Sequence, residues 1–159
     1  MYKVEEGRKM EITELRNYLE FKDTIIEWMN NEFGNEDSYH FYENIVNHSL
    51  IENKLPITFV AVEDGKLLGT VGVWRGDLLS RQDLFPWLSA LIVNSEYRNA
   101  GVGKKLQDYV LQYAKNKGYD EIFLYTDLKN YYEKNNWEKY DIGYEYTGTE
   151  ISIYKCNLK

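Results

Sequence analysis

The sequence predicts an α/β (α+β) domain in which a mixed β-sheet carries helices on its faces. Three features of the pattern lead to this fold class: helical periodicity near the N-terminus, a strand pair joined by a hairpin turn, and a strand that enters a helix through a glycine-rich turn. The chain has 159 residues and shows no repeat or linker, so we expect residues 1–159 to form a single domain.

Two helices are expected in the N-terminal third of the chain. Between Asp23 and Phe33 apolar residues recur on roughly one helical face, and Gly34 can end this helix. A second helix is expected from Ser38 to Leu50, with Ser38 as its N-cap. Its inward-facing side chains are expected to be Phe41, Ile45 and Val46.

Strand-forming residues dominate the stretch that follows. Residues 57–62 are rich in them, Asp64-Gly65 is a hairpin turn signal, and residues 67–74 read as the second strand. A polar loop from Gly76 to Pro86 then leads into an apolar run at 87–93, which we expect to be a strand.

The C-terminal half alternates helices and strands. Apolar residues recur at helical spacing from Val102 to Ala114, and Gly118 is expected to end that helix. The remaining expected elements are a buried strand at 122–125, a brief helix at 128–135, and a closing antiparallel pair at 140–146 and 149–158.

Composition excludes several classes of function. The net charge of −7 disfavours nucleic acid as the main partner, because duplex binding depends on basic surface, and it is compatible with a cationic small substrate. No apolar run is long enough for a membrane span, and the acidic residues 1–6 do not resemble a signal peptide, so we expect a cytoplasmic location. The single Cys156 is expected in a half-buried strand, and with only His40 and His48 besides, we expect no metal site.

The turn at residues 97–106 is the most informative segment, because it joins a strand to a helix through two glycines and a basic residue. Backbone N–H groups at such a helix N-terminus can hold a phosphate. A P-loop is excluded because Lys105 stands where that motif needs serine or threonine. A dinucleotide-binding fingerprint is excluded because Leu106 stands where it needs its third glycine.

The pattern Arg-x-x-Gly-x-Gly at residues 98–103 resembles the acetyl-CoA pyrophosphate loop of the GNAT acetyltransferase superfamily. Residues 124–126 and 131–137 are similar to the segment that closes the CoA site in that family, with Asn136 in place of its glycine. Asparagine tolerates the left-handed conformation required there. The polar loop that runs into Trp87 is also similar to the corresponding loop of a bacterial GNAT subgroup.

This resemblance implies a single N-acetyltransferase domain with a mostly antiparallel sheet of about six to seven strands, about four helices and a splayed central strand pair. It implies acetyl-CoA as co-substrate, no metal, and a small amine or peptide as acceptor, in an enzyme that could form a homodimer. Tyr132 falls at the position that implies a catalytic proton donor to the CoA thiolate. The implied acetyl-CoA-binding residues are Leu91, Ile92, Val93, Arg98, Asn99, Ala100, Gly101, Val102, Gly103, Lys104 and Asn130.

An acceptor amine with a pKa of about 10.4 is mostly protonated at neutral pH, so the reaction needs a base or a selected neutral amine. The candidates for the base are Asp127, Asp77 and Asp83, while Glu32 and Glu36 could bind a cationic substrate. The alternative hypothesis is a sensor or scaffold module that binds acyl-CoA without turnover. The identity of the acceptor stays open.

Overall fold

A computed structural model describes residues 9–159, so the acidic segment 1–6 lies outside the described residues. The strands of this described part form one seven-stranded sheet in the order β1-β2-β3-β4-β5-β7-β6, in which only the β4–β5 neighbours run parallel. The strands are β1 Glu11–Glu14, β2 Ile57–Glu63, β3 Lys66–Trp74, β4 Trp87–Val93, β5 Glu121–Thr126, β6 Glu138–Tyr144 and β7 Glu150–Asn157. The predicted mixed, mostly antiparallel sheet is confirmed. The sequence pattern did not predict the short polar strand β1.

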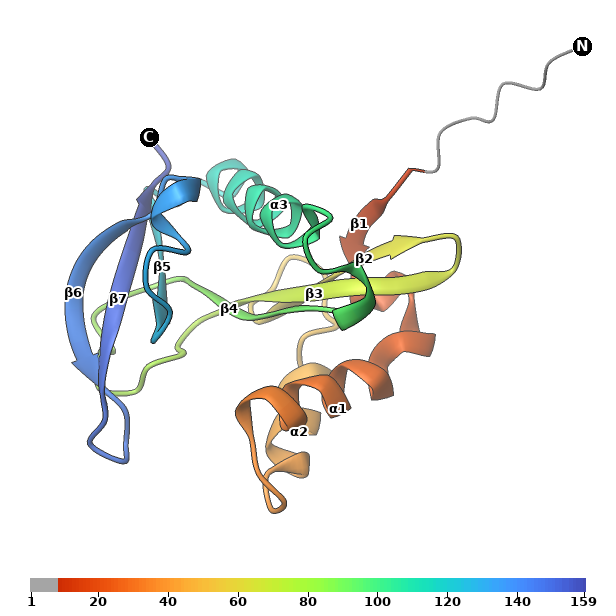
Figure 1. The fold of residues 1–159 in the computed structure, drawn as a ribbon, viewed down its shortest axis with the longest axis horizontal. Helices are drawn as coiled ribbons and strands as arrows, with labels where there is room; N and C mark the ends of the chain where they lie inside the picture. The colour runs from red at the N-terminus through yellow and green to blue at the C-terminus, as the bar shows by residue number, and fades with distance from the viewer. Residues whose placement is uncertain (1–8) are drawn as a thin grey trace, which may run out of the picture.

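Within residues 9–159, three α-helices cover the sheet: α1 Lys22–Phe33, α2 Tyr39–Asn47 and α3 Val102–Asn116. Figure 1 shows α3 on one face of the sheet and α1 with α2 on the other. The apolar face of α3 packs on strand residues such as Val71 and Leu88, whereas α1 and α2 pack on residues such as Val60 and Val62. Each helix therefore buries one stripe against one sheet face, as the helical periodicity requires. No helix within residues 9–159 is long and apolar enough to cross a membrane.

For the second helix, one prediction is wrong and another is confirmed in position only. Phe41 is 61% exposed, whereas its neighbour Tyr42 is buried. The i, i+4 pair formed by Tyr42 and Val46 faces the sheet, so Phe41 lies one position off that stripe. Ser38 does occupy the N-cap position, but its hydroxyl donates to Asn30 rather than capping the helix.

The predicted helix at 128–135 is also wrong, because only Glu133–Asn135 forms a short 3-10 turn. Asn130 has a φ of +60°, and a left-handed residue cannot continue a right-handed helix. This accounts for three α-helices where about four were expected. Gly118 and Asn136 both adopt the expected left-handed conformation, with φ values of +88° and +68°. Cys156 lies in β7 as expected, but it is buried rather than half-buried.

Candidate active site

The centre of the sheet opens between β4 and β5. These parallel strands share a single registered pair, Trp87 with Phe123, and no pairing follows it among the described residues. The neighbouring pair β3–β4 shifts register between Thr70 and Gly72, and Ala90 on β4 has a φ of +51°. Such a bulge bends a strand and leaves backbone groups unpaired. The expected splayed strand pair is therefore present, and the β5-facing edge of residues 91–93 is free.

The glycine turn lies beside this free edge. Gly101 is the N-cap of α3 with a φ of +80°, a conformation that costs glycine little. Within residues 9–159, no hydrogen bond uses the backbone N–H groups of residues 99–104, and the first one in the turn runs from Lys105 N to Gly101 O. These N–H groups and the helix dipole form a site for an anion.

Gly103 fits closely into its surroundings. A Cβ atom placed there would lie 3.2 Å from the Tyr131 hydroxyl and 3.5 Å from Val93 Cγ2. Glycine thus lets the first turn of α3 pack close to β4 and Tyr131. A larger side chain would fill the space in front of the free N–H groups.

A cavity of about 520 Å³ connects the turn with the open edge of β4. Tyr132 and every predicted acetyl-CoA-binding residue except Ala100 and Asn130 line it. Ala100 belongs to the exposed turn, and Asn130 takes the left-handed conformation described above. The lining also contains residues that the sequence reasoning did not assign to acetyl-CoA: Glu32, Tyr97, Leu128, Tyr131, Lys134 and Asn135. The aromatic pair of Tyr131 and Tyr132 was a signal that could have identified Tyr131.

The charge in this cavity favours an anionic ligand. Arg98, Lys104 and Lys134 all line it. Lys104 is paired with Asp108 at 2.8 Å, whereas Arg98 and Lys134 form no ion pair among residues 9–159. Two unpaired cations beside free N–H groups are suited to phosphate oxygens.

Tyr132 lines the cavity as a buried residue. Its side chain is 9% exposed and packs edge-on against Tyr131 and Trp137. Burial, and to a smaller extent Tyr131, raises the pKa of the Tyr132 phenol well above its ordinary 10. The phenol therefore keeps its proton at neutral pH and is available as a donor.

The predicted acidic candidates have different environments. Asp127 is exposed, and Asp83 is held by the Arg81 guanidinium, whose hydrogen bond lowers the pKa of Asp83. Asp77 is partly buried, and burial raises its pKa to about 7. Glu32 lines the cavity from α1, whereas Glu36 is exposed and does not line it.

Comparisons with known proteins agree with this geometry. The model of the acetyltransferase (GNAT) family matches residues 22–141. N-alpha-acetyltransferase 30 of Schizosaccharomyces pombe is 28% identical over 120 residues, which cover 71% of this chain and 79% of that protein. Human N-acetyltransferase 8 is 37% identical over 68 residues, which cover 43% of this chain and 30% of that protein. The structure of an aminoglycoside 6'-N-acetyltransferase complexed with coenzyme A has a TM-score of 0.72 and 18% identity, covering 94% of this chain and 97% of that chain.

Proposed function

The chain belongs to the acetyltransferase (GNAT) family, and we propose that it transfers the acetyl group of acetyl-CoA to a primary amine of a small molecule or peptide. The related proteins include N-acetyltransferases, and one structural neighbour contains coenzyme A. These similarities support an acyl transfer in which acetyl-CoA is the donor.

The observation that carries the proposal is the position of the anion site next to the free edge of β4. The unpaired N–H groups of residues 99–104 and the Arg98 guanidinium would hold the pyrophosphate of the donor. The open edge at residues 91–93 would pair with the amide groups of the pantetheine arm, as an added strand does. One cavity thus offers both kinds of contact that an extended CoA molecule requires.

The chemistry needs an oxyanion contact and a proton donor. When bound, acetyl-CoA supplies an activated thioester carbonyl that gains negative charge as the amine attacks. A backbone N–H at residues 91–93, beside the bulge of β4, would stabilise this charge. Tyr132, which keeps its proton, would protonate the departing thiolate.

The test measures thiol release from acetyl-CoA with a panel of primary amines: an alkyl polyamine, an aminoglycoside, an amino acid and a peptide with a free N-terminus. We expect thiol release with at least one amine and an N-acetylated product in equal amount by mass spectrometry. Acetyl-CoA binding without turnover on any amine would instead support the sensor function. Failure to bind acetyl-CoA would contradict both functions.

A further inference from the structure

The strands β4 and β5, which separate after their single pair, also present side chains on the face of the sheet opposite α3, the face on which α1 and α2 lie (Figure 1). Ser89 and Tyr125 each lie two residues beyond the last β4–β5 pair, so they lie on the face that carries Trp87 and Phe123. Trp87 and Phe123 belong to one buried cluster, and Tyr125 packs against it. Ser89, like Trp87 and Phe123, is buried at this place.

Asp77 is the carboxylate at this place. It belongs to the loop between β3 and β4, and the next residue, Leu78, is buried in the cluster of Trp87 and Phe123. Its negative charge is the second cause, after burial, of the raised pKa values of Tyr42 and Tyr125. Asp77 is therefore near enough to act electrostatically on a tyrosine of α2 and on a tyrosine of β5.

No cation compensates the charge of the Asp77 carboxylate. Within residues 9–159 no ion pair includes Asp77. The Ser89 hydroxyl, which favours the charged form of Asp77, is itself buried and makes no hydrogen bond within the usual distance limit. A buried polar group without a partner is costly, and such groups are typical of sites that bind a ligand. An ammonium group placed here would find a carboxylate, a hydroxyl acceptor and two aromatic rings, which are the groups that bind such cations.

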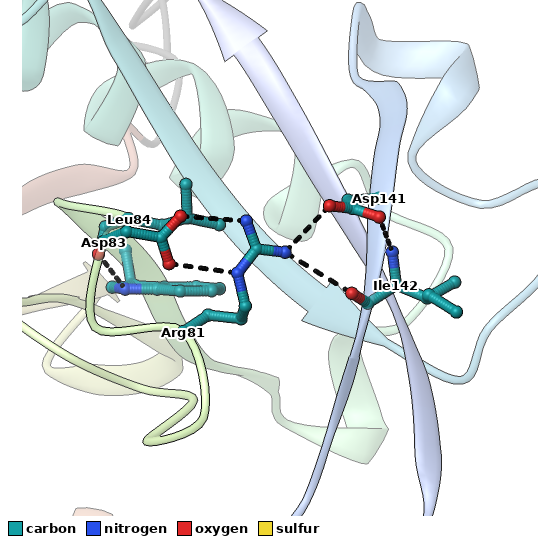
Figure 2. A network of polar contacts seen from close by, with 6 residues as sticks. Arg81, Asp83, Leu84, Asp141 and Ile142 are labelled. Carbon is teal, nitrogen blue, oxygen red and sulfur yellow. Dashed lines mark hydrogen bonds and ion pairs between the residues drawn. The ribbon is translucent and has the colours of Figure 1, made fainter.

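The loop that carries Asp77 is fixed to β6, the edge strand at the far end of the sheet order. Figure 2 shows the Arg81 guanidinium between Asp83 of the same loop and Asp141 of β6. Arg81 also donates to the carbonyl of Ile142, and the Ser80 hydroxyl donates to the carbonyl of Tyr144. These contacts hold the loop in one position, as a catalytic group requires.

We propose that Asp77 is the general base of the transfer and accepts a proton from the ammonium group of the acceptor amine beside the opening between β4 and β5. This inference rests on the proposed function. It also defines the acceptor chemically, as an amine that arrives protonated. Asp83 cannot take this role while both of its oxygens accept hydrogen bonds from Arg81.

The proton transfers balance over one turnover. Asp77 takes one proton from the ammonium, and the freed nitrogen forms a bond to the thioester carbon. The carbon–sulfur bond then breaks, its electron pair remains on sulfur, and Tyr132 protonates the thiolate. The second proton of the attacking nitrogen restores Tyr132 through water, and Asp77 releases its proton to solvent.

The pKa of Asp77 suits this task. Burial raises it from 3.8 to about 7, and the Ser89 hydroxyl partly opposes the increase by favouring the carboxylate. A base with a pKa near the working pH is close to the optimum for proton transfer. The other groups facing it are Tyr42 of α2 and Tyr125 of β5, with Glu145 acting on Tyr125, and both tyrosines have pKa values raised above 10.

The test compares Asp77→Asn with Asp120→Asn, a matched change at an exposed aspartate paired with Lys159. The assay uses acetyl-CoA and the best amine from the panel. We expect Asp77→Asn to lower kcat at least 100-fold at pH 7 while the Kd for acetyl-CoA stays within twofold. Asp120→Asn should retain wild-type kcat. Wild-type kcat in Asp77→Asn would overturn the inference and leave the proposed function intact.

A second measurement needs no variant. The kcat/KM of the wild type should decrease as the pH falls below about 7. The midpoint of this decrease should be the same for two amines of different pKa. A midpoint that moves with the pKa of the amine would overturn the assignment of Asp77 as the base. If the wild type acetylates no amine, the proposed function fails and this inference fails with it.

Discussion

Nη1 of Arg81 donates to Oδ2 of Asp141 at 3.0 Å, and the two residues are 60 positions apart in the chain (Figure 2). The loop is packed at this place as well, because Leu78 leaves no room for a side chain at Gly143 of β6. The loop before β4 is therefore part of the rigid sheet structure. The position of Asp77 therefore depends on contacts with β6, a strand that comes much later in the chain.

Replacing Arg81 with lysine should loosen this loop without unfolding the protein. Lysine keeps the charge but cannot hold two carboxylates in the planar arrangement of a guanidinium. We expect kcat to fall about tenfold and the Kd for acetyl-CoA to stay unchanged, because a small displacement of a catalytic group is costly. Arg75→Lys, at an exposed arginine of the same loop, is the matched control. Equal kcat values for the two variants would contradict the role of Arg81.

Asp77→Asn should stabilise the protein in a pH-dependent way. The folded pKa of Asp77 is raised to about 7, so the folded state binds more protons than the unfolded state between about pH 4 and pH 7. Stability is therefore lost as the pH rises through this window. The neutral asparagine avoids this loss, and we expect a gain of about 4 kcal/mol at pH 8 that vanishes below pH 4. Urea unfolding at several pH values measures it, and a pH-independent difference would exclude this cause.

Gly103→Asp should abolish donor binding while the fold is retained. An aspartate in the first turn of α3 interacts favourably with the helix dipole, which offsets part of the cost of its close contact with Tyr131. The same carboxylate would stand where the pyrophosphate is proposed to bind. We expect at least a 100-fold higher Kd for acetyl-CoA by calorimetry. Gly103→Ala separates bulk from charge, since its Cβ meets only ordinary or slightly close contacts, and it should bind at least tenfold more tightly than the aspartate variant.

Tyr132→Phe should separate catalysis from binding. The ring packs against Tyr131 and Trp137, and phenylalanine keeps these contacts while it removes the proton donor. We expect kcat to fall 10- to 100-fold and the Kd for acetyl-CoA to change less than threefold. Rapid-quench measurement of the chemical step is the suitable readout. An unchanged chemical step would show that another group protonates the thiolate.

Much of the fold could be predicted because local patterns encode local structure. The hairpin turn at Asp64-Gly65, the helix end at Gly118 and the left-handed Asn136 each follow from the conformational preferences of one or two residues. Alternation and helical spacing located six of the strands and the three α-helices. The buried face of α2 was predicted wrongly because Phe41 and Tyr42 fit two neighbouring helical stripes equally well. The helix at 128–135 was predicted wrongly because the left-handed Asn130 interrupts the helical pattern.

The sequence by itself determined the glycine turn and the segment around Tyr132, because these depend on spacing within a few residues. It named Asp77, Asp83 and Asp127 as equal candidates for the base. Only the tertiary structure separated them, by binding Asp83 to Arg81 and by placing Asp77 beside Ser89, Tyr42 and Tyr125. The physical reason is that burial and charge proximity depend on which distant segments pack together, and no local pattern contains that information.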